Sequence, residues 1–253
     1  MNNKKEESRE LQFKFEKNLT PFELDFLEYH RIRLNNLLKL LSYMINTKKR
    51  ESGPHSKMVK VLNIGLSVFD LIVKEKLSSF ENLDYYVAIP SLNFGKANYY
   101  DGINLIKIDI CNFGQEILEY NEVFDIIIFS GVLEHLFCSD RIVLKNLYKL
   151  LHKGGLMFLA VPNATSILNK LKLLIGRNIH WTKEDILGGT EFGGYGHIRE
   201  YTKYELINLV SPKFKIVKFL SINDYRVRGI NFSYFNKLIP VSWAIDIGII
   251  LKK

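Results

Sequence analysis

One carboxylate and two histidines stand where proton-transfer chemistry can be done. The run Ser130–Leu136 (SGVLEHL) follows an apolar stretch and places Glu134 next to His135. Further along the chain, His197 and Arg199 lie in the short sequence GHIRE. Histidine is the usual proton acceptor near neutral pH, because its ordinary pKa lies close to that range. His135 and His197 are therefore the candidate catalytic residues, and Arg199 is a candidate for binding a carboxylate or a phosphate.

A second candidate site is the turn that follows the apolar run Val59–Gly65 (VKVLNIG). A dinucleotide-binding turn needs three glycines in the pattern Gly-x-Gly-x-x-Gly. Here Gly65 is followed by LSVF, which argues against NAD or FAD, and the sequence contains no Gly-x-x-x-x-Gly-Lys phosphate loop. A cofactor without a pyrophosphate tolerates such a turn.

The elements that must position these residues alternate between strands and helices. Short apolar runs predict buried strands, and apolar residues at helical spacing predict the helices between them. The predicted strands are Val59–Gly65, Tyr85–Ile89, Asn104–Ile110, Phe124–Ser130, Leu156–Val161, Phe214–Ile222 and Asp246–Leu251. The predicted helices are Phe69–Leu77, a helix from Asp140 that stops at Gly154, Ala164–Ile175, Thr202–Val210 and Phe232–Ala244, the last of them broken at Pro240. This alternation predicts an α/β fold with a doubly wound sheet that binds its ligand at the carboxyl ends of the strands.

A long helix precedes this pattern. Thr20, Pro21 and Glu23 form a typical helix start, and apolar residues recur at helical spacing to about Asn46. We therefore divide the chain into a disordered tail (1–18), a helix with its linker (19–54) and a main domain (55–253). The main domain has an insertion at about 164–200, whose glycine-rich run Gly188–Gly196 predicts a loop.

The composition is that of an ordinary globular protein of 253 residues, 47% of them apolar. The two cysteines, Cys111 and Cys138, make no disulfide framework, which favours a reduced, cytoplasmic location. We find no secretory signal and no apolar run long enough to span a membrane. Residues 1–60 carry 13 Lys or Arg against 8 Asp or Glu, a net charge of +5. Residues 61–164 carry 8 against 12, a net charge of −4, and residues 165–253 carry 14 against 7, a net charge of +7. The basic flanks can therefore attract an anionic partner.

Three stretches resemble the class I S-adenosylmethionine-dependent methyltransferases, in particular the bacterial small-molecule and glycan type with a His-x-Arg-x-Tyr-Thr segment. The stretches are FDIIIFSGVLEHL, LLHKGGLMFLAVPN and GHIREYTKYELINLV. The resemblance covers about residues 20–253 and implies a Rossmann-like, mostly parallel sheet of seven strands with S-adenosylmethionine as the cofactor. It implies that Tyr195 and Arg199 bind the substrate. It also implies that the cofactor-binding residues are Asn63, Gly65, Leu66, Ser67, Pro90, Asp109, Ile110, Ser130, Gly131 and Val132.

The sequence departs from this family at the cofactor site. Asn63 stands in place of the acid that ends the first strand, and Phe69 stands where the family has a glycine. Pro90 aligns with the acid that binds the ribose hydroxyls, whereas the acid on the adenine side is kept as Asp109. A carboxylate that accepts two hydrogen bonds is a strong contact, so its loss predicts weakened binding of the cofactor.

Some relatives hold a divalent cation with a Glu-x-x-Glu-His stretch and a later histidine. Here Gly131 replaces the first glutamate of that pattern, and we expect no metal. Trp181, Phe192 and Tyr195 surround the glycine-rich loop and offer rings that can stack on a sugar or a base, although aromatic residues more often serve packing.

The sequence thus predicts methyl transfer from S-adenosylmethionine to a small-molecule or glycan-type acceptor, and we expect an anionic acceptor over a neutral one. Two alternatives stay open: a binding or scaffold protein that has lost the cofactor, and an RNA methyltransferase, which only the charge favours. A nucleic-acid partner is not expected, peripheral membrane contact is left open, and the oligomeric state is unknown. We expect the N-terminal helix and residues 164–196 to cover the strand ends. If the acceptor is anionic, the basic side chains that should face the cleft are Arg31, Arg33, Lys172, Arg177 and Arg199.

Overall fold

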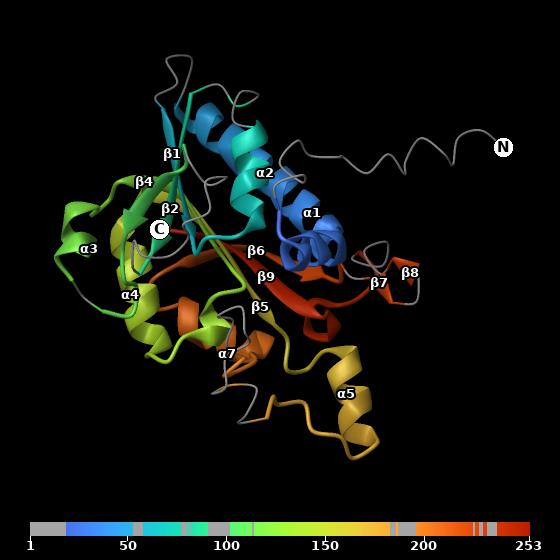
Figure 1. Ribbon diagram of the computed structural model, residues 1–253. Coiled ribbons are helices and arrows are strands. Elements are labelled where there is room, and N and C mark those ends of the chain that lie inside the picture. Colours follow the sequence, from blue (N-terminus) through green and yellow to red (C-terminus); the bar gives the residue numbers. More distant parts are fainter. Residues whose placement is uncertain are drawn as a thin grey trace.

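The computed structural model describes residues 19–52, 58–76, 80, 82–90, 102–112, 114–182, 186, 196–224, 226–227, 230–231 and 237–253 (Figure 1). Its main sheet has seven strands in the order β3-β2-β1-β4-β5-β9-β6. They are β1 (Val59–Ile64), β2 (Leu83–Ile89), β3 (Asn104–Lys107), β4 (Phe124–Ser130), β5 (Leu151–Pro162), β6 (Lys215–Ile222) and β9 (Asp246–Lys252). Strand β9 runs antiparallel to β5 and β6, and the other neighbours pair in parallel. The predicted fold class is confirmed. A separate short ribbon joins β7 (Arg226–Val227) to β8 (Ile230–Asn231).

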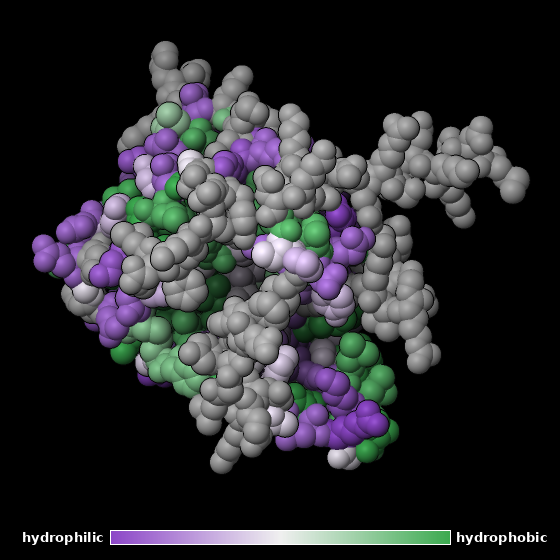
Figure 2. Space-filling model, in the orientation of Figure 1, coloured by the Kyte–Doolittle hydropathy of each residue, from purple (hydrophilic) through white to green (hydrophobic). Residues whose placement is uncertain are grey.

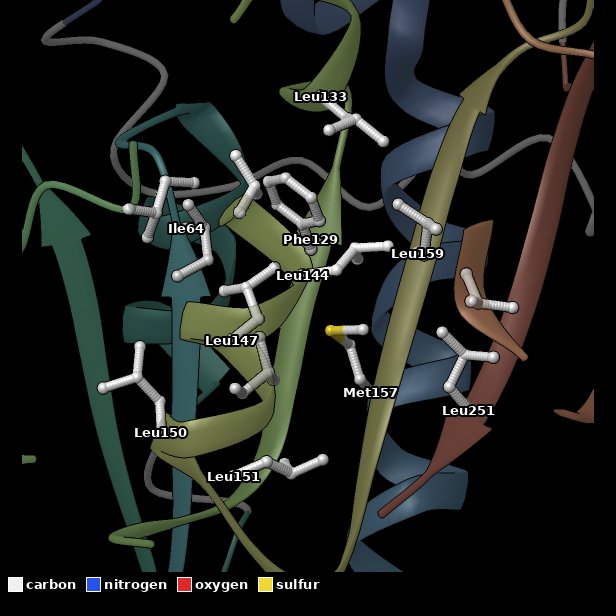
Figure 3. Packing of buried hydrophobic residues seen from close by; sticks show 14 of the residues in the cluster. Ile64, Phe129, Leu133, Leu144, Leu147, Leu150, Leu151, Met157, Leu159 and Leu251 are labelled. Carbon is white, nitrogen blue, oxygen red and sulfur yellow. The ribbon is translucent and has the colours of Figure 1, made fainter. Parts of the chain in front are cut away.

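Helices cover both faces of the sheet. They are α1 (Pro21–Ser52), α2 (Val68–Lys76), α3 (Gln115–Glu119), α4 (Asp140–Leu150), α5 (Ile167–Leu174) and α7 (Lys203–Val210). One face packs against α1 and α2, and the other against α3, α4 and α7. Figure 3 shows the second layer, in which Leu144 and Leu147 of α4 meet Phe129 and Met157 of the sheet. Among the described helices α5 alone contributes no side chain to either cluster, and it lies beyond the end of β5 (Figure 1).

The N-terminal helix begins as predicted. The backbone N–H of Thr20 donates to Glu23 Oε2 at 2.9 Å, and the N–H of Glu23 donates to Thr20 Oγ1 at 3.3 Å. The helix continues to Ser52, beyond its predicted end at about Asn46, and so takes up most of the stretch that was expected to be a linker before residue 55. Lys48 holds this last turn, because its ammonium group donates to Glu51 at 2.7 Å and to the carbonyl of Gly154 at 3.0 Å.

Three further boundaries differ from the prediction. Helix α4 ends at Leu150, before the two glycines, because β5 already begins at Leu151. The third strand ends at Lys107, because the carboxylate of Asp109 accepts hydrogen bonds from the residues that follow it and forms a turn. The predicted helix Phe232–Ala244 is wrong in its second half, where Val241–Trp243 forms a single 3₁₀ turn, η6. Residues 1–18, 188–195 and 232–236 lie outside the described parts of the chain.

The two cysteines form a pair that the sequence did not predict. Cys111 and Cys138 are joined by a disulfide, with their Cα atoms 5.6 Å apart. The amide of Asn146, in the middle of α4, donates to the carbonyls of Ile110 and Asn112, each at 3.0 Å, and so holds the loop after β3 against that helix. Because the two cysteines are paired, their number no longer supports the prediction of a reduced, cytoplasmic location. Within the described chain, no helix has both the length and the hydrophobicity needed to cross a membrane.

Candidate active site

A cleft of about 580 Å³ opens at the carboxyl ends of β1 and β4. One wall is α1, as expected for a helix that covers the strand ends, and the turns after β1 and β4 form the floor. Trp181, His197 and Asp246 complete the lining. Of the predicted site residues, the cleft brings together Asn63, Gly65, Leu66, Ser67, Ser130, Gly131, Val132, His135 and His197.

The turn after β1 is held together by a buried carboxylate. Asp70 is fully buried and accepts hydrogen bonds from Asn63 Nδ2 at 2.8 Å, from the Tyr85 hydroxyl at 2.7 Å and from the Ser67 N–H at 2.7 Å. Asn63 also donates to the carbonyl of Gly65 at 2.9 Å. Asn63 therefore stabilises the conformation of the turn after β1 by hydrogen bonds inside the protein. The Phe69 ring is buried in the core and does not fill the cleft, although its residue belongs to the lining.

Two glycines keep the floor of the cleft open. Gly65 has φ +89° and Gly131 has φ +70°, a left-handed conformation that side chains disfavour. A Cβ atom on Gly65 would stand 3.4 Å from Val132, and one on Gly131 would stand 3.5 Å from the guanidinium of Arg33. The backbone at both strand ends is therefore exposed to a ligand.

Arg33 carries positive charge from α1 into this floor. Its Nη1 lies 3.4 Å from Asp246 Oδ2, and its Nη2 donates to Ser130 Oγ at 3.5 Å. Asp246 is buried at the start of β9. The other four basic side chains that were expected to face the cleft do not line it. Arg31 is a buried residue of α1, and Arg199 lines a different hollow. Lys172, in α5, and Arg177, just after that helix, are exposed to solvent.

Beside Arg33, three side chains meet at one side of the cleft. Glu134, His135 and His197 each present a ligand-type atom, and these atoms lie within 4.8 Å of one another. Glu134 Oε1 is 4.0 Å from His135 Nε2, and the two imidazole rings are 5.0 Å apart, edge to face. The segments meet because the Ile198 N–H donates to the carbonyl of Glu134 at 2.8 Å. Two adjacent residues of the sequence thus gain a partner 62 residues away.

Burial sets the charge of this cluster. It raises the pKa of Glu134 to about 8, against smaller opposing effects from a backbone hydrogen bond and from Arg33. It lowers the pKa of His197 to about 4, and the nearby charges of His135 and Arg33 act in the same direction. Near neutral pH the Glu134 carboxyl is thus mostly protonated and His197 is neutral. Glu134 Oε2 and His197 Nδ1 are buried and have no hydrogen-bond partner among the described residues.

The remaining predicted site residues lie apart from this cleft. Pro90 is exposed at the end of β2, and Asp109 and Ile110 follow β3, one strand further out. The Asp109 carboxylate accepts from the Cys111 N–H at 2.9 Å and from Asn112 Nδ2 at 2.6 Å. These three positions share the carboxyl edge of the sheet with the cleft but are not among its lining residues.

Of the two predicted substrate-binding residues, the structure describes Arg199, which does not line the cleft. Arg199 lines a different hollow, where it pairs with Glu205 at 2.7 Å and lies 3.7 Å from Asp140. Arg199 therefore supports the capped start of α7 in this structure. Tyr195 lies outside the described residues.

Comparison with known proteins identifies the family of this chain. Residues 67–211, more than half of the chain, match the family model of a methyltransferase domain. The chain belongs to the class I S-adenosylmethionine-dependent methyltransferases. No curated protein sequence matches it.

Solved structures show the same fold at low sequence identity. A SAM-dependent methyltransferase from Archaeoglobus fulgidus is 14% identical, with a TM-score of 0.55, and the match covers 92% of this chain and 100% of that one. A possible histamine N-methyltransferase from Thermotoga maritima is 16% identical, with a TM-score of 0.56 and coverage of 94% and 97%. The N-methyltransferase NodS from Bradyrhizobium japonicum, solved with S-adenosylhomocysteine, is 16% identical, with a TM-score of 0.53 and 94% coverage of both chains.

The cleft of this methyltransferase fits its cofactor, S-adenosylmethionine. The turns at Gly65 and Gly131 carry no side chain where a ligand must approach the backbone. Arg33 offers a charge that complements the carboxylate of the cofactor's methionine part. The sequence reasoning missed the network around Asp70, which gave no signal because its partners lie on separate elements. Of the five basic side chains that were expected at the cleft, Arg33 lines it.

Proposed function

We propose that this methyltransferase acts on a hydroxyl group of a glycan-type acceptor, with His135 and His197 as the catalytic residues. The observation that carries the proposal is the meeting of Glu134, His135 and His197 at the wall of the cofactor cleft. A hydroxyl group is a weak nucleophile until its proton is removed, so its methylation gains most from a base held beside it. Neutral imidazole rings fit that requirement.

The roles follow from position. S-adenosylmethionine supplies an activated methyl group and leaves as S-adenosylhomocysteine. As the acceptor oxygen bonds to the methyl carbon, its proton passes to His135, whose side chain is about one-third exposed to the cleft. Glu134 Oε1 lies 4.0 Å from His135 Nε2, so the imidazolium lowers the pKa of the Glu134 carboxyl, which releases its own proton to solvent and then stabilises the ring as a carboxylate. The His197 ring lies 5.0 Å from the His135 ring, edge to face, and also lines the cleft, so we assign it to holding the acceptor hydroxyl toward His135.

The acceptor side of the cleft supports a sugar-like molecule. The Trp181 ring lies 5.2 Å from the His197 ring and is about half exposed, so it offers a flat surface for a sugar ring. A second hollow of about 840 Å³ between α1 and β6 shares Arg33, Leu37 and Ser130 with the cleft and has room for the rest of the acceptor. Arg33 is the described basic flank residue that lines both, and it favours an acceptor with a phosphate or carboxylate.

Activity measured with labelled S-adenosylmethionine and a set of nucleotide-linked and lipid-linked sugars tests the base. His135→Gln and His197→Gln should each lower kcat by about 100-fold or more and leave the affinity for S-adenosylhomocysteine within about twofold. His180→Gln, an exposed histidine of the same region, is the matched control. Full activity of His135→Gln would remove His135 from the mechanism.

Calorimetric titration tests the cofactor site separately. Because Pro90 stands where the family has its ribose-binding acid, we expect S-adenosylhomocysteine to bind about one to two orders of magnitude more weakly than with that acid present. Absence of heat at millimolar ligand would contradict the proposed site.

We propose that the cluster works without a metal. Its three side chains can hold a divalent cation, but the guanidinium of Arg33 lies close enough to affect the pKa of both Glu134 and His197 and would repel one. Treatment with a chelator should leave activity unchanged. Loss of activity that zinc or manganese restores would show that the cluster is a metal site.

A further inference from the structure

Helix α5 presents its apolar side chains to solvent. An amphipathic helix on a protein surface normally turns its apolar side toward the core. Here five consecutive or near-consecutive apolar residues are exposed: Leu168 (43%), Leu171 (51%), Leu173 (55%), Leu174 (81%) and Ile175 (69%). Figure 2 shows hydrophobic side chains, in green, gathered at the lower right where Figure 1 places α5.

The side of α5 that faces the protein is polar. Asn169 is buried, and its amide donates to the carbonyl of Asn163 at 3.0 Å and to Glu200 Oε2 at 2.7 Å. Ser166 caps the helix by accepting from the N–H of Asn169 at 3.2 Å. The orientation is therefore fixed by hydrogen bonds, so the exposure of the leucines does not result from a loosely attached helix.

Basic residues and a tryptophan border the exposed leucines. Residues 164–182 contain Lys170, Lys172 and Arg177 and no Asp or Glu. The ammonium group of Lys170 lies 4.4 Å from the centre of the Trp243 ring, which is itself about half exposed. Apolar side chains flanked by basic residues and tryptophan are the combination that binds the interface of an anionic bilayer.

We propose that this surface docks the enzyme on an anionic lipid bilayer. The α5 surface consists of Leu168, Leu171, Leu173, Leu174, Ile175 and Trp243 with Lys170, Lys172 and Arg177. Eight helical residues extend only about 12 Å, so α5 lies in the plane of the interface and does not span the membrane. The inference does not depend on the proposed acceptor.

Charge favours a lipid surface over a second copy of the chain. Two α5 surfaces placed face to face would bring together six positive charges with no acidic residue between 164 and 182 to offset them. Anionic headgroups complement the same charges. The surface also adjoins the hollow between α1 and β6, because Val241 lines that hollow and begins the η6 turn that carries Trp243.

Co-sedimentation with vesicles tests the proposal. The full chain should bind vesicles of phosphatidylglycerol and phosphatidylethanolamine and bind phosphatidylcholine vesicles far less. The double variant Leu174→Ser/Ile175→Ser should bind at least about tenfold more weakly, because two of the most exposed apolar side chains are removed. Lys172→Gln and Arg177→Gln should each weaken binding about fivefold on the anionic vesicles alone.

The control is Leu118→Ser, which alters a leucine of α3 that is 56% exposed. It should bind vesicles like the unaltered protein. Unchanged binding of S-adenosylhomocysteine by every variant shows that the fold and the cofactor site are intact. Failure of the unaltered chain to bind anionic vesicles, or equal binding by the double variant, overturns the proposal. So does a dimer in light scattering that the double variant dissociates, since a second copy would then cover α5.

Discussion

Replacing Glu134 by glutamine should remove a pH-dependent weakness of the folded protein. Burial raises the pKa of this carboxyl from 4.5 to about 8. Below pH 4.5 the group is protonated in both the folded and the unfolded chain. Between these two values the folded chain binds more protons than the unfolded chain, so the free energy of unfolding falls as pH rises. Ionising Glu134 in the folded chain costs up to about 5 kcal/mol more than in the unfolded chain. The free energy of unfolding of the unaltered protein therefore falls by about 2–3 kcal/mol between pH 5 and pH 7.

Glutamine has nearly the same shape and stays neutral. The difference in unfolding free energy between Glu134→Gln and the unaltered protein should therefore rise by about 2–3 kcal/mol from pH 5 to pH 7. Urea unfolding at three pH values, followed by tryptophan fluorescence, measures it. Glu122→Gln is the matched control. The pKa of Glu122 is lowered by Lys253, which lies 2.9 Å away, so this difference should stay nearly flat. A Glu134→Gln difference that is the same at every pH would refute the reasoning.

Substitutions at three further positions test the turn after β1 and the binding of the cofactor. Tyr85→Phe removes the hydroxyl that donates to buried Asp70 at 2.7 Å. It should lower the free energy of unfolding, measured by urea titration, by about 1–3 kcal/mol. Tyr204→Phe, the control at an exposed tyrosine, should change that free energy little. Pro90→Glu should tighten S-adenosylhomocysteine binding in calorimetry, because it returns a carboxylate to the end of β2; unchanged affinity would show that Pro90 is not the ribose position. Arg33→Met should weaken that binding by about tenfold and Arg33→Lys by less, and equal affinities would separate Arg33 from the cofactor.

The sequence by itself determined the sheet and the elements that carry the site. Continuous apolar runs such as Phe124–Ser130 can only be strands covered on both faces, and the alternation of strands with helices leaves few topologies. The sequence also predicts features that depend only on residues close together in the chain, such as the capping of a helix start. The start of α1 is held by the predicted Thr20–Glu23 pair, and a Thr202–Glu205 pair with the same spacing holds the start of α7.

Only the tertiary structure decided what these elements bring together. Glu134 and His197 are far apart in the sequence, and they meet because one backbone hydrogen bond from Ile198 joins their segments. Their burial then shifts both pKa values, an effect that no local pattern contains. For the same reason helical spacing predicted α5 but not which of its sides faces the protein. Which side of a helix faces the protein depends on its anchoring contacts, and here Asn169 provides them, which leaves the leucines in solvent.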